Sequence, residues 1–76
     1  MANTYATTDL SLSAFLQALG HQLVDVLNDR GRGTFVFADT EELRQNILKW
    51  GNNQPVSIQV RGFVNLMRDL KGMVGV

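Results

Sequence analysis

The sequence contains no cysteine and only one histidine, His21. The lack of cysteine excludes disulfide bonds and thiolate metal sites, and a single histidine excludes a site built from several imidazoles. Neither sign of charge is in excess, because seven basic residues balance seven acidic ones. Dedicated nucleic-acid binders usually carry surplus positive charge, since counterion release supplies much of their affinity. Neutrality therefore argues against that class, although it allows a local basic patch.

Long apolar stretches are lacking as well. The apolar runs span only a few residues, which is too short for a transmembrane helix. The first residues, from Met1 to Thr4, do not show the basic segment and apolar stretch of a secretory leader. We therefore expect a cytoplasmic protein with no membrane partner. At 76 residues and 45% apolar content, the chain is expected to fold as a single domain, residues 1–76.

The first part of the sequence predicts a strand followed by a helix. Residues 4–8 are rich in strand-forming side chains, and Asp9 after them is a good N-cap for a helix. Four large apolar side chains follow at the spacing of one helical face: Leu12, Phe15, Leu16 and Leu19. We therefore expect a helix at about Leu10–Leu19.

The middle of the sequence predicts a β-hairpin. Residues 21–28 and 34–38 are strand-like, and between them lies the polar tip Asn28-Asp29-Arg30-Gly31-Arg32-Gly33. The two glycines can supply the positive φ that a turn requires, so we expect a connection of about five residues. The segment 34–38 is apolar on both faces, which predicts a strand that is covered on both sides or that lies centrally in the sheet.

Two further helices are predicted in the second half. Asp39 and Glu42 form a capping-box pattern, and an apolar 3.6-residue period then runs to Trp50. Residues 56–61 fit both a strand and a helix, and we place a short extended segment at 56–58 and a helix at about 60–73.

These elements assemble into an α+β domain with the order β-α-β-β-α-(β)-α. We expect a three-stranded, mostly antiparallel sheet with the helices packed on one face. The predicted core consists of apolar residues from every element: Leu12, Phe15, Leu16, Leu19, Leu23, Val24, Val26, Phe35, Val36, Phe37, Leu43, Ile47, Trp50, Val60, Phe63, Val64, Met67 and Leu70.

Four segments, in order and spacing, resemble a family of short bacterial and bacteriophage proteins known as a domain of unknown function. They are Tyr5-Ala6-Thr7-Thr8-Asp9-Leu10, Ala14-Phe15-Leu16 with Gly20-His21, Gly31-Arg32-Gly33-Thr34-Phe35-Val36-Phe37, and Arg68-Asp69-Leu70-Lys71. The resemblance covers residues 4–73. It implies a small accessory protein of a bacterium, phage or mobile element, acting in the host cytoplasm if a phage encodes it. It supplies no functional residues.

No set of residues in the sequence predicts catalysis, a metal or a cofactor. His21 could serve as a general base or pH switch, but no nucleophile or orienting partner is marked, and a cap or strand start explains it equally. The acids Asp9, Asp25, Asp29 and Asp39 match no metal-binding spacing. Caps and turns account for three of them, and Asp25 is expected to face outward from its strand. We therefore expect a protein that is not an enzyme.

Two kinds of binding surface can be drawn from the sequence. Surplus apolar positions on the last helix and strand favour a protein interface, for which the candidates are Trp50, Met67, Met73 and Val74. For Trp50 a place in the core is the alternative. They favour a protein-interaction module that binds a partner or itself as a homodimer, which would also stabilise so small a domain. The alternative is a small nucleic-acid-binding or regulatory protein. It would use the basic residues at the hairpin tip and on one side of the last helix: Arg30, Arg32, Arg61, Arg68 and Lys71. An ordinary solvated turn is the simpler explanation of the tip residues.

Overall fold

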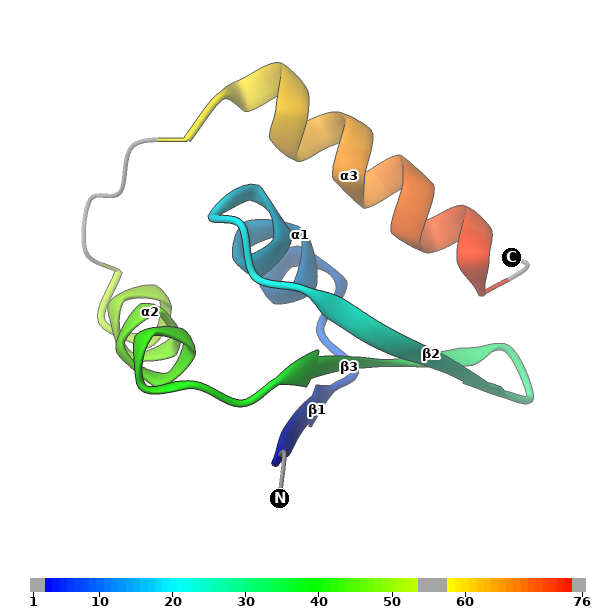
Figure 1. Cartoon of the computed structure of the whole chain (residues 1–76). Coiled ribbons are helices and arrows are strands. Elements are labelled where there is room, and N and C mark those ends of the chain that lie inside the picture. The colour runs from blue at the N-terminus through cyan, green and yellow to red at the C-terminus, as the bar shows by residue number, and fades with distance from the viewer. Residues whose placement is uncertain (1–2, 54–57, 75–76) are drawn as a thin grey trace.

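The computed structural model describes residues 3–53 and 58–74 of the chain. Its elements follow the order β1 (Thr4–Thr7), α1 (Leu10–Ala18), β2 (Leu23–Asp29), β3 (Arg32–Ala38), α2 (Glu41–Gly51) and α3 (Val60–Met73). The strands form one antiparallel sheet with the order β1-β3-β2, and the helices lie on one side of it (Figure 1). The predicted α+β class is confirmed. Among the described residues, no helix combines the length and apolar character needed to cross a bilayer.

Helix α1 lies at the centre of the core. Asp9 caps it, because its Oδ1 accepts a hydrogen bond from the N–H of Leu12 at 3.0 Å. Every residue from Leu12 to Leu16 is buried, including Ser13, whose Oγ donates to the carbonyl of Asp9 at 2.8 Å. A surface helix buries only one stripe, so this continuous burial shows that α1 is enclosed on several sides.

Strand β3 is the central strand of the sheet, as predicted. Phe35 and Phe37 point to the helix side and are fully or nearly fully buried. Thr34, Val36 and Ala38 lie on the opposite face and are half-buried. In the described part of the chain no element covers that face (Figure 1), so of the two predicted explanations for the apolar faces of β3 the central position is confirmed.

The hairpin turns more tightly than the sequence suggested. Asp29 pairs with Arg32, so the connection is the two residues Arg30 and Gly31 rather than about five. Both have positive φ, 53° and 82° respectively, which is the backbone signature of a type I′ turn. Gly33 lies outside the turn, within β3.

Glycine is required at position 33 because another residue packs closely against its backbone. A Cβ at this position would overlap the Cγ1 of Val74, which follows the last turn of α3. Nearby, the Nδ2 of Asn28 donates to the carbonyl of Val74 at 2.9 Å. These two contacts hold the C-terminal end of α3 on the hairpin.

Three residues assigned to the core by their periodicity are exposed. Val24 is 46% exposed, because a β-bulge between Leu23 and Asp25 moves it out of the regular alternation. Val60 is 75% and Val64 is 43% exposed. They lie on the first turns of α3, on a flank that does not meet α1. Conversely, Val74, which was predicted to lie at an interface, is only 7% exposed because it packs into the core.

Two boundaries also differ from the prediction. The N-cap of α2 is Thr40, whose Oγ1 accepts the N–H of Leu43 at 3.0 Å, and not Asp39. The extended segment expected at 56–58 lies mostly outside the described residues, and Ile58, which is described, is not in a strand. Helix α3 begins and ends where the sequence placed it.

The contact between Gly33 and Val74 can be tested by substitution. Gly33→Ala should lower the free energy of unfolding by about 1–3 kcal/mol, because the new methyl group overpacks the site. Gly72→Ala is the matched control: no atom lies near its Cβ position, and replacing glycine in a helix should stabilise by up to about 1 kcal/mol. Urea unfolding would measure both. An unchanged Gly33→Ala penalty in a Val74→Ala background would show that Val74 is not the cause.

Candidate functional site

The two edges of the sheet are unlike each other. Strand β2 carries a bulge at Leu23/Asp25, and the Oδ1 of Asp25 accepts the neighbouring N–H of Val26 at 2.9 Å. Bulges and charged side chains are the usual means by which an edge strand avoids further pairing. Strand β1, with the sequence Thr-Tyr-Ala-Thr, carries no charge, no proline and no bulge in its pairing with β3. Among the described strands none pairs with its outer edge, which is therefore open to another strand.

Hydrogen bonds around β3 show which groups of β1 face that open edge. The N–H of Asp39 donates to the carbonyl of Asn3 at 2.9 Å, whereas the N–H of Ala38 points the other way, to the carbonyl of Gln22 in the segment preceding β2. Because bonded and non-bonded pairs alternate in an antiparallel ladder, Tyr5 and Thr7 bond toward β3. The N–H and C=O groups of Thr4 and Ala6 consequently point away from the sheet.

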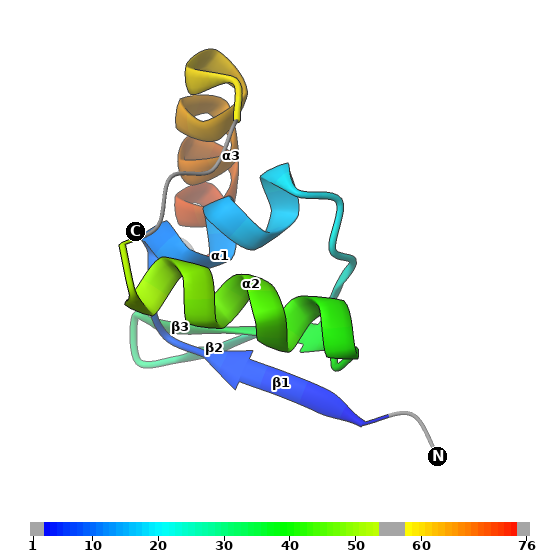
Figure 2. The ribbon, with the colours of Figure 1, turned by 90° about the vertical axis from the view of Figure 1, so that its left-hand side faces the viewer.

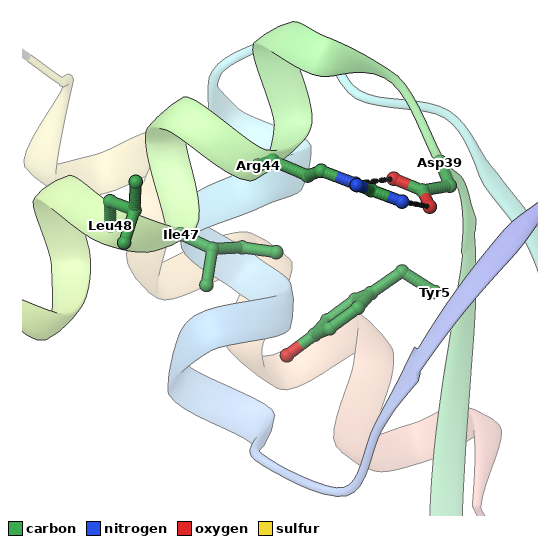
Figure 3. A pocket seen from close by; sticks show the side chains of 5 residues that line it. All are labelled: Tyr5, Asp39, Arg44, Ile47 and Leu48. Atoms are coloured by element: carbon green, nitrogen blue, oxygen red, sulfur yellow. Dashed lines mark hydrogen bonds and ion pairs between the residues drawn. The ribbon is translucent and has the colours of Figure 1, made fainter.

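A pocket of about 410 Å³ lies between β1 and α2. Its lining consists of Tyr5, Asp39, Arg44, Ile47 and Leu48 and is largely apolar. Figure 3 shows the ring of Tyr5 extending from β1 beneath Ile47, with Arg44 and Asp39 closing one end. Leu48 is 58% exposed at the rim. We call this pocket, together with the open edge of β1, the β1–α2 groove.

The polar end of the groove is formed by a bidentate ion pair between Arg44 and Asp39. The Nε of Arg44 donates to Oδ1 of Asp39 at 3.0 Å, and its Nη2 donates to Oδ2 at 2.7 Å. The hydrogen bond from Arg44, helped by its charge, lowers the pKa of Asp39, and the same contact raises the pKa of Arg44. The two charges neutralise each other, so the groove presents no net charge to a ligand.

This arrangement could bind an extended segment of chain. A strand laid beside β1 could bond to the free main-chain groups of Thr4 and Ala6, and every second side chain would face the pocket. Within residues 3–53 and 58–74, no three His, Cys, Asp or Glu side chains gather as a metal ion would require.

His21, the candidate base, makes a structural contact. Its Nε2 lies 2.7 Å from the Nδ2 of Asn46, which is buried on α2. An unprotonated Nε2 can accept this hydrogen bond, and the main-chain N–H of His21 donates to the carbonyl of Leu16. The contact ties the end of α1 to α2 and gives the polar Asn46 a partner inside the core.

The candidate nucleic-acid residues are exposed but are not one cluster. Arg30 and Arg32 lie at the hairpin tip. Arg61, Arg68 and Lys71 share one side of α3, away from its buried stripe. Arg61 and Lys71 are separated by about 15 Å along the helix, at 1.5 Å per residue. Only the C-terminal end of α3 lies near the hairpin (Figure 1).

The candidate interface residues have different environments. The ring of Trp50 packs on Phe15 with centroids 4.8 Å apart and an interplanar angle of 42°, and Trp50 is half-buried. Met67 is half-buried against the core, and Met73 is 53% exposed. They do not form one continuous surface with the buried Val74. The interface role of Trp50, Met67 and Met73 stays a prediction.

The groove residues Tyr5, Arg44 and Leu48 were missed by the sequence analysis. Leu48 offered a signal, because it is a large apolar residue off the buried stripe of its helix. Arg44 was also within reach of Asp39, because it lies in the first turn of the helix that follows Asp39. Nothing in the sequence shows that β1 and α2, more than 30 residues apart, form one groove.

The His21–Asn46 contact should contribute to stability. We expect His21→Ala and Asn46→Ala each to destabilise the fold, and the double variant to show a coupling free energy of about 1 kcal/mol, because each single change removes the same hydrogen bond. Urea unfolding of the four proteins would measure it. Gln45→Ala, on the exposed side of α2, should change stability by less than about 0.5 kcal/mol. Strictly additive effects at His21 and Asn46 would contradict the contact.

The Asp39–Arg44 pair should make stability depend on pH. Since Arg44 lowers the pKa of Asp39 below its unfolded value of about 4, the pair contributes stability above that pH. The contribution is lost as the pH falls through the lower pKa of the folded state. Asp39→Asn should therefore destabilise the protein near neutrality and approach the wild type in acid. Asp69→Asn, on the exposed side of α3, is the control. A pH-independent difference for Asp39→Asn would contradict the ion pair.

Comparison with known proteins adds a family but no named relative. Searches of curated proteins and of solved structures found no significant match. The family model described as Domain of unknown function (DUF5659) matches residues 2–76. The match spans nearly the whole chain and includes both β1 and α2. The chain therefore belongs to the DUF5659 family, a domain of unknown function.

Proposed function

We propose that this domain is a non-enzymatic interaction module that captures an extended segment of a partner protein in the β1–α2 groove. The observation that carries the proposal is an unguarded edge strand beside a largely apolar pocket. Addition of a strand to such an edge is a recurring mode of peptide recognition, in which main-chain bonds supply affinity and pockets supply specificity. An accessory role in a bacterium, phage or mobile element is part of this proposal.

The groove favours a foreign segment over a second copy of the chain. In a pair of copies joined through β1, the residues facing the helix side would be Tyr5 and Thr7 of each copy. Tyr5 already lines its own pocket, and Thr7 is small and polar. In such a dimer no apolar side chain of one copy would enter the pocket of the other. Homodimerisation through β1 would therefore leave the apolar lining of both pockets exposed to water.

The lining also defines the chemistry of the segment. Arg44 and Asp39 satisfy each other, so a charged ligand side chain would find no free counter-charge in the pocket. An aliphatic or aromatic side chain would cover Ile47 and the exposed Leu48 and gain from their removal from water. The proposed ligand is thus an uncharged, extended segment with one apolar anchor residue.

Selection from a displayed library of random peptides of about seven residues would test this proposal. We expect the selected peptides to be rich in apolar and β-forming residues and to shift the amide NMR signals of Thr4, Ala6 and Leu48. Methylation of the peptide amides should abolish binding at every second position, because only alternate N–H groups face β1.

A pair of charge-matched variants sharpens the test. Leu48→Asp should weaken the selected peptides by at least about tenfold, because it places a charge at the rim of the pocket. Val60→Asp is the control, since Val60 is more exposed than Leu48 and lies on α3. Failure to select any binder, or equal effects of the two variants, would refute the proposal. Concentration-dependent dimerisation with the same amide shifts would assign the edge to a second copy instead.

A further inference from the structure

We propose that the hairpin tip contacts the phosphate backbone of a nucleic acid, through Arg30 and with Arg32 beside it. This inference is independent of the β1–α2 groove. It starts from the backbone of Arg30, whose φ of 53° lies in the left-handed region. Among the described residues other than glycine, only Arg30 and Asn53 have a positive φ.

The left-handed conformation is unfavourable for arginine. Type I′ turns prefer Asn, Asp or Gly at the first central position, because these residues tolerate a positive φ. An arginine there gives up part of the stability that Asn would provide. Its side chain lies at the tip of the hairpin and is exposed, so packing does not account for the presence of arginine. Strain of this kind at an exposed position indicates a role for the side chain itself.

The charge distribution points to an anionic ligand. The part of the chain formed by residues 23–38 and 58–74 carries five basic and three acidic side chains, whereas residues 3–22 and 39–53 carry two basic and four acidic ones. The neutral total thus conceals a net positive charge on the segments that form the hairpin and α3, of which only the C-terminal end of α3 lies near the tip. Within the hairpin itself the acidic side chains are Asp29, opposite Arg32, and Asp25 further along β2. Asp29 weakens the contribution of Arg32, so Arg30 is the principal contact.

The shape of the hairpin makes the tip accessible. Strand β1 pairs only with residues 35–38 of β3, so residues 32–34 pair with β2 alone as a two-stranded ribbon. The turn projects away from α1 and α2 at one end of the molecule (Figure 1). A guanidinium at the end of a ribbon is well placed to fork onto a phosphate. A nucleic acid carries a phosphate at every step of its backbone, so one protruding guanidinium can contact it in any register, and we therefore favour nucleic acid.

Fluorescence anisotropy with a labelled DNA duplex of about 20 base pairs, and with one of its single strands, would test the proposal at about 20 mM salt. Two phosphate contacts predict that affinity falls about tenfold between 50 and 200 mM salt. Arg30→Asn should weaken binding by about tenfold and at the same time raise the midpoint of urea unfolding, because it relieves the turn. A purely structural arginine would not produce this opposite pair of effects.

Two further variants separate the explanations. Arg30→Lys keeps the charge and should retain most of the binding. Lys49→Asn removes an exposed charge on α2, in the net acidic part of the chain, and should leave binding unchanged. The proposal is overturned if neither DNA probe binds at low salt, or if Arg30→Asn and Lys49→Asn have equal effects. It is also overturned if a polyglutamate peptide binds as tightly as DNA with the same dependence on Arg30, which would assign the tip to an acidic protein.

Discussion

The whole structure depends on the enclosure of one short helix. Helix α1 is buried along every residue from Leu12 to Leu16, and the sheet and both other helices are arranged around it. Ser13 can lie there because its hydroxyl bonds to the carbonyl of Asp9, and its small size lets a neighbouring element approach closely. A nine-residue helix offers little surface, so each surrounding element buries only part of its apolar side chains. The exposed apolar residues of α2 and α3 follow directly from this.

The local part of the fold could be predicted from the sequence, because caps and periodicity act over a few residues. The start of α1 at Leu10, the bounds of α3 and the central position of β3 are of this kind. What failed depended on contacts between distant segments. The helical stripe of α3 included Val60, but only the packing of α3 on α1 decides how far along the helix that stripe is covered. Likewise, Gly33 resembled a turn residue, and only its contact with Val74 reveals its actual constraint.

The candidate site was beyond sequence reasoning for the same reason. Asp39 has the ideal chemistry for a helix cap, yet Thr40 takes that place and leaves the carboxylate free to bind Arg44. A local pattern cannot decide between two adjacent cap residues when the first of them, Asp39, gains an ion pair instead of the cap. The basic residues, in contrast, were found by composition alone, since charges on turns and exposed helix faces are visible without knowledge of the fold.

The β1–α2 groove is itself a consequence of the central position of α1. Helix α2 is anchored on α1, where Trp50 packs on Phe15 and Asn46 bonds to His21, rather than on β1. Figure 2 shows α2 running alongside the strand. The contacts that fix α2 are thus on the side of the helix that faces α1. The other side, which carries Leu48, does not pack against Tyr5, and the pocket lies between them. A larger domain would fill such a gap with further chain, whereas this one leaves it open next to its only unguarded edge within the described residues.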